Sequence, residues 1–336
     1  MERSSRVPIT LFTELEAPEL VELLARGEVD AALRTGRFGI SMAMLDLSAE
    51  RAQAIRALEA RGIEVTAWLL LDPADGYWLN ADNAEKALGR FRELDAFAHE
   101  NDLRLARVGL DIEPPRKDLD ELIHDGLPAL VRLIRRRRSR ATIDAAESAY
   151  AQLCEAIRRT GRSVETYCIP LILDEVRAGS TLLRRVLGIV DAPADDRVPM
   201  AYSTYLGRAL ALAFLRGNRA AAIGVTGGGV FADQDGPRVL DWGQVQQQLD
   251  WAASFGTERL YVFSLEGCAD SGMLPKLADW EPGARPPLGA IALLGGLARF
   301  GLRALLRTER ALDRYRPVAP TGQAPRIDGR WTARSA

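Results

Sequence analysis

The strongest constraint on the fold is an alternation of short β-type runs with amphipathic helical stretches, repeated eight times along the 336 residues. Each run is rich in apolar residues and leads into a turn signal and a helical pattern. This alternation favours a parallel sheet, and eight units favour an α/β fold closed as a (β/α)8 TIM barrel over a doubly wound open sheet. The expected strands are 8–15, 38–45, 64–72, 106–113, 164–170, 198–205, 220–227 and 259–267.

The chain is longer than this architecture requires, because a TIM barrel typically takes about 250 residues. We expect a single barrel domain over residues 1–316, with a helical insertion at about 118–160 between strands four and five. A long loop is expected at about 268–287, after strand eight. The segment 288–316 is predicted to be the eighth barrel helix, and residues 317–336 a loose C-terminal tail.

Composition narrows the classes of function. The 44 Lys and Arg residues nearly balance the 46 Asp and Glu residues, so we expect no nucleic-acid partner. The chain has three widely spaced cysteines, typical of a reduced protein, and only two histidines, which disfavours imidazole metal sites and Ser-His-Asp catalysis. No signal peptide is visible and no apolar run reaches the roughly 20 residues of a membrane span. We therefore expect a cytoplasmic protein without a transmembrane segment.

Two carboxylates end the fourth expected strand. The apolar residues of this strand alternate with Gly109, Asp111 and Glu113, so these three are predicted to point into the barrel. The two acids are about 6.6 Å apart along the strand, from a rise of ~3.3 Å per residue. Like charges at that spacing raise the pKa of one carboxyl group, which keeps it protonated near neutral pH as a general acid. An ion pair with Arg116 or Lys117 is the competing explanation.

Three other expected strands end in acids on the same rim. Alternation turns Glu14 inward at the end of strand one and Asp72 inward at the end of strand three. In strand eight, Tyr261 and Phe263 are expected to face the outer helices, which turns Glu266 toward the barrel mouth. An ion pair or a loop cap explains any one of these acids. Their convergence on the mouth, where TIM-barrel active sites lie, predicts a functional site.

Aromatic residues accompany the acids. Alternation points Trp68 and Tyr202 inward, and Tyr167 is a further candidate. Flat rings stack on sugar faces while sugar hydroxyls bond to carboxylates, so the combination predicts a carbohydrate substrate. Glu14, Trp68, Asp72 and Tyr167 are the candidate substrate-binding residues.

The ending Asp111-x-Glu113 resembles the glycoside hydrolase barrels whose fourth strand ends in Asp-x-Glu, as in chitinase-like family-18 enzymes and family-25 lysozymes. The resemblance implies that Glu113 is the general acid and Asp111 its electrostatic and orienting partner. Met200-Ala201-Tyr202 resembles the chitinase Met-x-Tyr, which implies that Tyr202 supports the acetamido group of the substrate. The chain departs from the family-18 pattern at Gly109, where that family has a further Asp.

These residues predict a glycoside hydrolase-like enzyme, with Asp111, Glu113, Tyr202 and Glu266 in catalytic roles. On a 2-acetamido sugar the substrate's carbonyl oxygen would be the nucleophile, held by Asp111 and Tyr202; otherwise Glu266 or Glu14 would serve. No cofactor and no metal are predicted. Two alternatives stay open. One is a metal-dependent sugar isomerase-like barrel whose acids bind Mg²⁺ or Mn²⁺, and the other is a non-hydrolytic carbohydrate-binding barrel.

Overall fold

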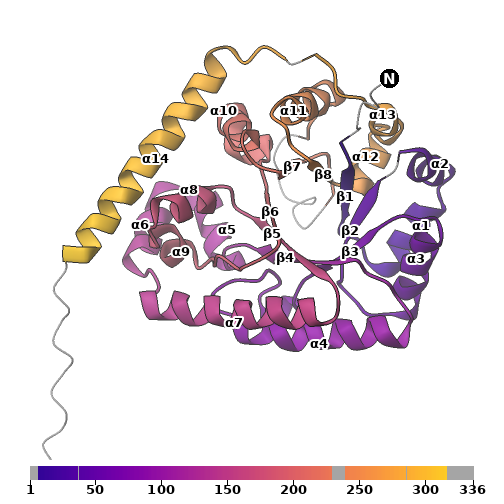
Figure 1. Cartoon of the computed structure of the whole chain (residues 1–336), viewed down its shortest axis with the longest axis horizontal. Coiled ribbons are helices and arrows are strands. Elements are labelled where there is room, and N and C mark those ends of the chain that lie inside the picture. Colours follow the sequence, from indigo (N-terminus) through magenta and orange to yellow (C-terminus); the bar gives the residue numbers. More distant parts are fainter. Residues whose placement is uncertain (1–6, 37, 229–238, 285, 316–336) are drawn as a thin grey trace, which may run out of the picture.

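The computed structural model describes residues 7–36, 38–228, 239–284 and 286–315, and this part of the chain forms a (β/α)8 TIM barrel, as predicted (Figure 1). The described strands are β1 (Ile9–Thr13), β2 (Gly39–Ala43), β3 (Val65–Leu69), β4 (Arg107–Ile112), β5 (Ser163–Cys168), β6 (Asp196–Pro199), β7 (Ala220–Gly224) and β8 (Arg259–Phe263). Neighbouring strands pair in parallel in the order β6-β5-β4-β3-β2-β1-β8-β7. A parallel bridge from Met200, just after β6, to β7 completes the ring.

Helices cover the outside of the sheet. They are α1 (Ala17–Ala25), α2 (Gly27–Thr35), α3 (Ala49–Ala60), α4 (Ala84–Glu100), α5 (Arg116–Asp125), α6 (Leu127–Arg135), α7 (Arg140–Arg159), α8 (Leu171–Ala178), α9 (Leu182–Leu187), α10 (Ser203–Leu215), α11 (Trp242–Ser254), α12 (Leu265–Asp270), α13 (Leu274–Asp279) and α14 (Gly289–Tyr315). Side chains cap the N-termini of two of these helices. At α3 the Ser48 side chain accepts a hydrogen bond from the Arg51 amide, and at α11 Asp241 and Gln244 form a capping box.

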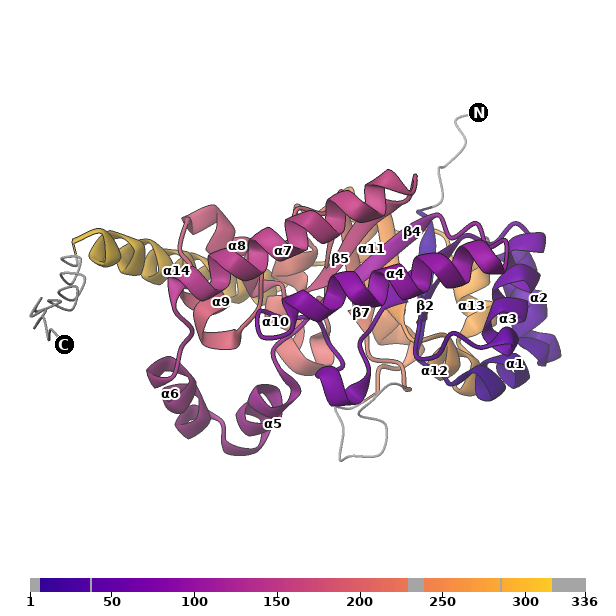
Figure 2. The ribbon, with the colours of Figure 1, turned by 90° about the horizontal axis from the view of Figure 1, so that it is seen from below.

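The segment between β4 and β5 forms three helices. The helix α7 packs against α4 and β5 in the outer layer, whereas α5 and α6 stand off from the body of the barrel (Figure 2). The additional length predicted between strands four and five therefore lies in α5 and α6. The expected tail, 317–336, lies outside the described residues.

The strands have two apolar faces, one toward the helices and one toward the barrel axis. In β4, Val108, Leu110 and Ile112 belong to the outer core, while Asp111 lies inside next to Trp68. The same alternation holds in β1, where Leu11 packs outward and Phe12 inward, and in β3. The faces predicted for strands one and four are confirmed, as is that of strand three within β3. This alternation is what delivers the strand-four acids to the barrel interior. The prediction that Asp72 points inward is wrong, because Asp72 lies beyond the end of β3 and is exposed.

The floor of the interior is a hydrogen-bonded layer of tyrosines. Tyr167 contacts Ser41 and donates to Glu165, with both oxygen–oxygen distances 2.6 Å, and Tyr261 donates to the other Glu165 oxygen at 2.7 Å. Burial raises the pKa of Glu165, although the two tyrosine hydrogen bonds oppose the shift. Gly109 faces the Tyr167 ring so closely that a Cβ there would overlap it. The glycine at this position therefore makes room for Tyr167.

Substituting Gly109 with alanine is expected to lower the free energy of unfolding by about 1–3 kcal/mol, because the added methyl group overpacks the Tyr167 layer. Chemical denaturation measures the change. The matched control is Gly89→Ala, because Gly89 lies in α4 with open space around its Cα, and alanine there is expected to be neutral or stabilising. Equal stabilities for Gly109→Ala and the wild type would contradict the packing role of Gly109.

One predicted strand face is wrong. Tyr261 and Phe263 were expected to face the helices, but both lie in the barrel interior, and Val262 packs outward. The alternation in β8 separates aromatic from aliphatic residues rather than polar from apolar ones. Both faces of this strand are buried in apolar surroundings, so hydrophobicity does not identify the inner one.

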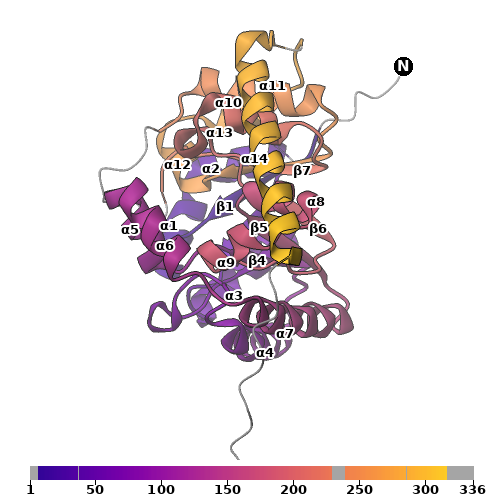
Figure 3. The same ribbon diagram turned by 90° about the vertical axis from the view of Figure 1, so that its left-hand side faces the viewer.

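The prediction of an eighth barrel helix at 288–316 is also wrong. The segment 268–287, expected to be a long loop, contains the end of α12 and all of α13. After β8, α12 packs against β1 and α13 against α2, whereas α14 crosses the outside of α10 and α8 (Figure 3). Two features hold α14 there. Gly295 approaches α10 so closely that a Cβ would overlap the Ala209 carbonyl oxygen. Arg299 forms a two-pronged ion pair with the buried Asp174, with both distances 2.8 Å, and Arg303 contacts the same carboxylate at 2.7 Å.

The segment Gly289–Leu312 of α14 is, among the described helices, the one long and apolar enough to cross a membrane. Only 17% of its most apolar stretch is buried inside the protein. The expected absence of a membrane-spanning segment therefore stays a prediction.

Candidate active site at the barrel mouth

The end of β4 and the chain after β3 lie side by side at the barrel mouth. The amide of Leu79 donates to the Asp111 carbonyl at 3.0 Å, and the Glu113 amide donates to the Leu79 carbonyl at 3.1 Å. The same returning segment places Tyr77 against the end of β1, where its hydroxyl donates to Glu14 Oε1 at 2.6 Å. The ends of two strands, β1 and β4, thus supply one acidic cluster, which we define as Glu14, Asp111 and Glu113.

Asp111 is the most deeply buried acid of this cluster, with 1% of its surface exposed. Its Oδ2 accepts from Trp68 Nε1 at 3.2 Å, and its Oδ1 is buried with no hydrogen-bond partner among the described residues. Burial, together with the negative charges of Glu113 and Glu14, raises the pKa of Asp111 well above its usual value. A buried acid with an unsatisfied oxygen can bond to a substrate group at the mouth.

Glu113 follows directly after β4 and is partly exposed at the rim. Burial and the negative charge of Glu14 raise its pKa from 4.5 to about 8. At neutral pH the Glu113 carboxyl group therefore carries a proton, which is the state a general acid needs. Its position at the end of strand four and the direction of its pKa shift match the sequence expectation, but the charge responsible is that of Glu14 rather than that of Asp111.

Glu14 is held differently from Glu113, because the hydrogen bond from Tyr77 stabilises negative charge on its carboxylate. Tyr77 adopts a left-handed backbone with a φ of +63°, directly after Gly76 with a φ of +108°. A left-handed backbone is uncommon for residues other than glycine. At Tyr77 it directs the phenol hydroxyl toward Glu14. Two carboxyl groups in one mouth, of which Glu113 has a raised pKa and Glu14 accepts a hydrogen bond, can divide the roles of acid and base.

Tyr77 was not among the predicted site residues. It lies in the turn after β3, where no periodic pattern determines the direction of a side chain. The sequence shows a tyrosine directly after a glycine that could form a turn. This pattern does not predict which strand end the tyrosine ring contacts.

Glu266 comes to the mouth from the first turn of α12 rather than from β8 itself. Its Oε1 accepts from the Glu14 amide at 3.4 Å, and its Oε2 is buried with no partner among the described residues. Gly228, with a φ of +76°, lies against it, since a Cβ there would be 2.6 Å from Glu266 Cγ. Burial raises the pKa of Glu266 to about 7. The negative charge that raises the pKa of Glu113 is that of Glu14 rather than that of Glu266.

Tyr202 stands at the start of α10, beside the acidic cluster. Burial and the charges of Asp111 and Glu113 raise its pKa well above the usual value for tyrosine, so its hydroxyl keeps its proton and can donate a hydrogen bond. Its ring lies 6.1 Å from that of Phe263 and 6.4 Å from that of Tyr205. The structure therefore brings Tyr202 to the predicted acids.

The other candidate substrate-binding residues have different positions. Trp68 lies in the interior and contacts Asp111. Tyr167 lies in the floor layer, 1% exposed, with its hydroxyl engaged by Ser41 and Glu165. Asp72 is exposed and its carboxylate accepts from the Ala74 amide, which caps a short turn after β3. Binding roles for these three residues stay predictions.

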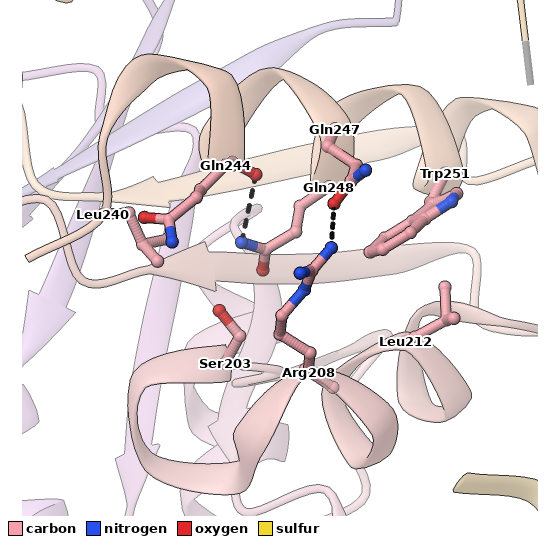
Figure 4. Close-up of a pocket in the computed structure, with 9 residues that line it drawn as sticks. Ser203, Arg208, Leu212, Leu240, Gln244, Gln247, Gln248 and Trp251 are labelled. Atoms are coloured by element: carbon pink, nitrogen blue, oxygen red, sulfur yellow. Dashed lines mark hydrogen bonds between the residues drawn. The ribbon is translucent and has the colours of Figure 1, made fainter. Parts of the chain in front are cut away.

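A small pocket lies beside the mouth, between α10 and α11 (Figure 4). Arg208 donates to the Gln247 side chain and lies over the Trp251 ring, and the Gln248 side chain donates to the Gln244 carbonyl. Ser203, next to Tyr202 in the sequence, also lines it. None of the lining residues belongs to the acidic cluster, so this pocket is distinct from the candidate active site.

Within the described residues, no group of three or more His, Cys, Asp or Glu side chains is arranged to hold a metal ion. The acidic cluster and Glu266 therefore do not form a ready set of metal ligands in this part of the chain.

The raised pKa of Glu113 predicts a pH-dependent contribution to stability. The unfolded chain loses the Glu113 proton near the usual value of 4.5, whereas the folded protein holds it to about 8. The stabilising contribution of the protonated side chain is complete below pH 4.5 and is lost as the pH rises through 8. Relative to Glu113→Gln, the wild type should therefore be more stable at pH 5 than at pH 9. Urea denaturation of both proteins measures this difference, and a constant difference would contradict the raised pKa.

No protein-family model matches the chain, and no curated protein matches it. The resemblance to chitinase-like enzymes and family-25 lysozymes therefore stays a prediction.

Several solved barrel structures are similar to this one over most of its length. The glycoside hydrolase domain of PgaB (BpsB) from Bordetella bronchiseptica has 10% identity and a TM-score of 0.48, covering 82% of this chain and 98% of that one. D-allulose 3-epimerase from Methylomonas sp. has 12% identity and a TM-score of 0.43, covering 88% and 98%. A xylose isomerase-like TIM barrel protein from Mycobacterium smegmatis has 15% identity and a TM-score of 0.39, covering 81% and 97%. At such identities and TM-scores, none of them bears on the reaction of this chain.

Proposed function

We propose that this chain is a carbohydrate-active barrel enzyme that hydrolyses a glycosidic bond, with Glu113 as the general acid. The observation that carries the proposal is the state of Glu113: burial and the Glu14 charge raise its pKa to about 8 at the rim of the barrel mouth. Cleavage of a glycosidic bond requires a proton on the departing oxygen. A carboxylic acid that is still protonated at neutral pH supplies it.

Glu14 is the second carboxylate of the proposed reaction. Glu113 gives its proton to the glycosidic oxygen as the bond from that oxygen to the anomeric carbon breaks. Glu14, whose negative charge is supported by Tyr77, either bonds to the anomeric carbon or removes a proton from an attacking water. In the first case, water releases the sugar from Glu14 in a second step and returns a proton to Glu113. In both cases one water is consumed for each bond cleaved.

Asp111 and Tyr202 are proposed to hold the sugar next to the broken bond. Asp111 has a buried oxygen without a partner, and Tyr202 keeps its proton and can donate a hydrogen bond. The resemblance of Asp111-x-Glu113 to the fourth-strand ending of glycoside hydrolase barrels supports this assignment. Trp68, which donates to Asp111, orients that carboxyl group, and Tyr167 forms the floor beneath it.

The test is product release from a panel of oligosaccharides that differ in linkage and in the 2-substituent, namely hydroxyl, acetamido or amine. We expect the wild type to release new reducing ends from at least one member and Glu113→Gln to release far fewer. Glu16→Gln is the matched control, because Glu16 is an exposed glutamate two residues from Glu14. It is expected to behave as the wild type.

Two results would overturn this proposal. Binding of an oligosaccharide that survives Glu113→Gln, without product from any member of the panel, indicates a non-hydrolytic binding barrel. Interconversion of free sugars that requires added Mg²⁺ or Mn²⁺ and stops on chelation indicates the isomerase-like alternative.

A further inference from the structure

The outward side of α14 is the largest unpartnered apolar helix face in the described part of the chain. Leu293, Leu297 and Phe300 follow a helical spacing of four and three residues and are 66–70% exposed. Leu294 and Leu305 lie beside them and are also exposed. We call these five residues the α14 outer face. Burial of such side chains from water is favourable by about 1.5–3 kcal/mol each, so a face of this size favours an apolar partner.

A cavity of about 200 Å³ lies along one edge of this helix, between α14 and α10. Its walls are largely apolar, with Leu212, Phe255, Leu288 and Ala292 among the lining residues. Arg216 also lines the cavity, is exposed, and makes no ion pair or hydrogen bond within the described part of the chain. An apolar cavity with a cation beside it suits an anionic amphiphile. The apolar chain of such a molecule would enter the cavity, and its anionic head group would contact Arg216.

The charges beside the α14 outer face are mainly of one sign. Arg303, which is ion-paired with Asp174, lines the cavity, and Arg307 lies one helical turn further along α14 and is exposed. We call Arg216 and Arg307, whose side chains make no ion pair among the described residues, the arginine edge. A helix with an apolar face and a basic edge is typical of segments that lie on the surface of an anionic bilayer.

We infer that α14 and the cavity beside it dock this protein onto the surface of an anionic phospholipid bilayer. The outer face enters the region between head groups and acyl chains, the arginine edge meets the lipid phosphates, and the cavity accepts part of one acyl chain. The whole chain has a net charge of −2, so the attraction depends on this local cluster of arginines.

Two other arrangements fit the observations less well. A membrane-spanning α14 would carry Arg299 and Arg303 into the bilayer and leave the buried Asp174 without its ion pairs. A pair of antiparallel α14 helices from two copies of the chain would bring the two arginine edges together, and like charges facing each other oppose association.

The experiment is co-sedimentation of the full chain with phosphatidylcholine vesicles, with and without phosphatidylglycerol. We expect binding to the mixed vesicles only, weakening as the salt concentration rises. Arg216→Gln and Arg307→Gln should each weaken binding about five-fold. The double variant Leu297→Gln/Phe300→Gln should weaken it by more than about a hundred-fold, since each removed side chain contributes about ten-fold or more.

The matched control is Ile123→Gln/Leu127→Gln, which removes two exposed apolar side chains from α5 and α6 and should leave vesicle binding unchanged. Both double variants alter exposed positions, so unchanged thermal unfolding confirms that each is folded. No binding to mixed vesicles, or binding that is insensitive to Leu297→Gln/Phe300→Gln, overturns the inference. A dimer in solution that the same double variant dissociates, without vesicle binding, assigns the face to self-association instead.

Discussion

Glu113→Gln is expected to lower kcat on an unactivated glycoside by about 10²–10⁴-fold, the usual cost of losing a general acid, with KM nearly unchanged. Glutamine has the shape of the protonated side chain but cannot give up a proton to the departing oxygen. Burial and the Glu14 charge already keep Glu113 uncharged at neutral pH, so the substitution changes the electrostatics of the bound substrate little. Steady-state kinetics on the substrate found in the oligosaccharide panel measure both constants.

A substrate with a good leaving group provides the control for this prediction. A nitrophenyl glycoside needs no proton on its departing oxygen, so Glu113→Gln should slow its cleavage far less than that of the natural linkage. The wild-type rate on the natural linkage should also fall as the pH rises through about 8, where Glu113 loses its proton. An equal loss on both substrates would mean that Glu113 acts in some way other than as the proton donor.

Glu14→Gln is expected to be as damaging as Glu113→Gln, again about 10²–10⁴-fold in kcat, because Glu14 is proposed to attack the anomeric carbon or to activate water. Tyr77→Phe should reduce kcat by a smaller factor, since it removes only the hydrogen bond that supports the Glu14 charge. Glu266→Gln should also cost much less, because Glu266 contacts the Glu14 amide rather than Glu113. The three variants are compared at the same pH on the same substrate.

The substituent at the 2-position of the sugar distinguishes Glu14 from the substrate's own acetamido group as nucleophile. With Glu14 in that role, a 2-hydroxy sugar should be cleaved about as well as its 2-acetamido counterpart. If Glu14→Gln is mild and only acetamido sugars are cleaved, the substrate's carbonyl oxygen is the nucleophile, with Asp111 and Tyr202 holding it. That outcome would reject the role proposed for Glu14 while keeping Glu113 as the acid.

Much of the site could be predicted because strand alternation is a local property. Asp111 and Glu113 follow from the two-residue period of strand four, and Glu14 from that of strand one. The chain after a strand obeys no such period. Tyr77 reaches Glu14 through a left-handed turn, and Glu266 arrives from the first turn of α12, so neither position follows from alternation.

The sequence by itself determined the order of the eight strands and which side of β1, β3 and β4 faces the barrel axis, because these depend on residues only a few positions apart. The expected strands 198–205 and 259–267 end earlier than predicted, because α10 and α12 begin within those ranges. Only the tertiary structure decided the face of β8, the path of α14 and the packing of Tyr167 against Gly109. In β8 both faces are buried, so the residue pattern is the same for either orientation. The position of α14 depends on Asp174, which lies 125 residues away in the sequence from its partner Arg299. Contacts between such distant residues have no period along the chain, and they form only when the barrel brings its helices together.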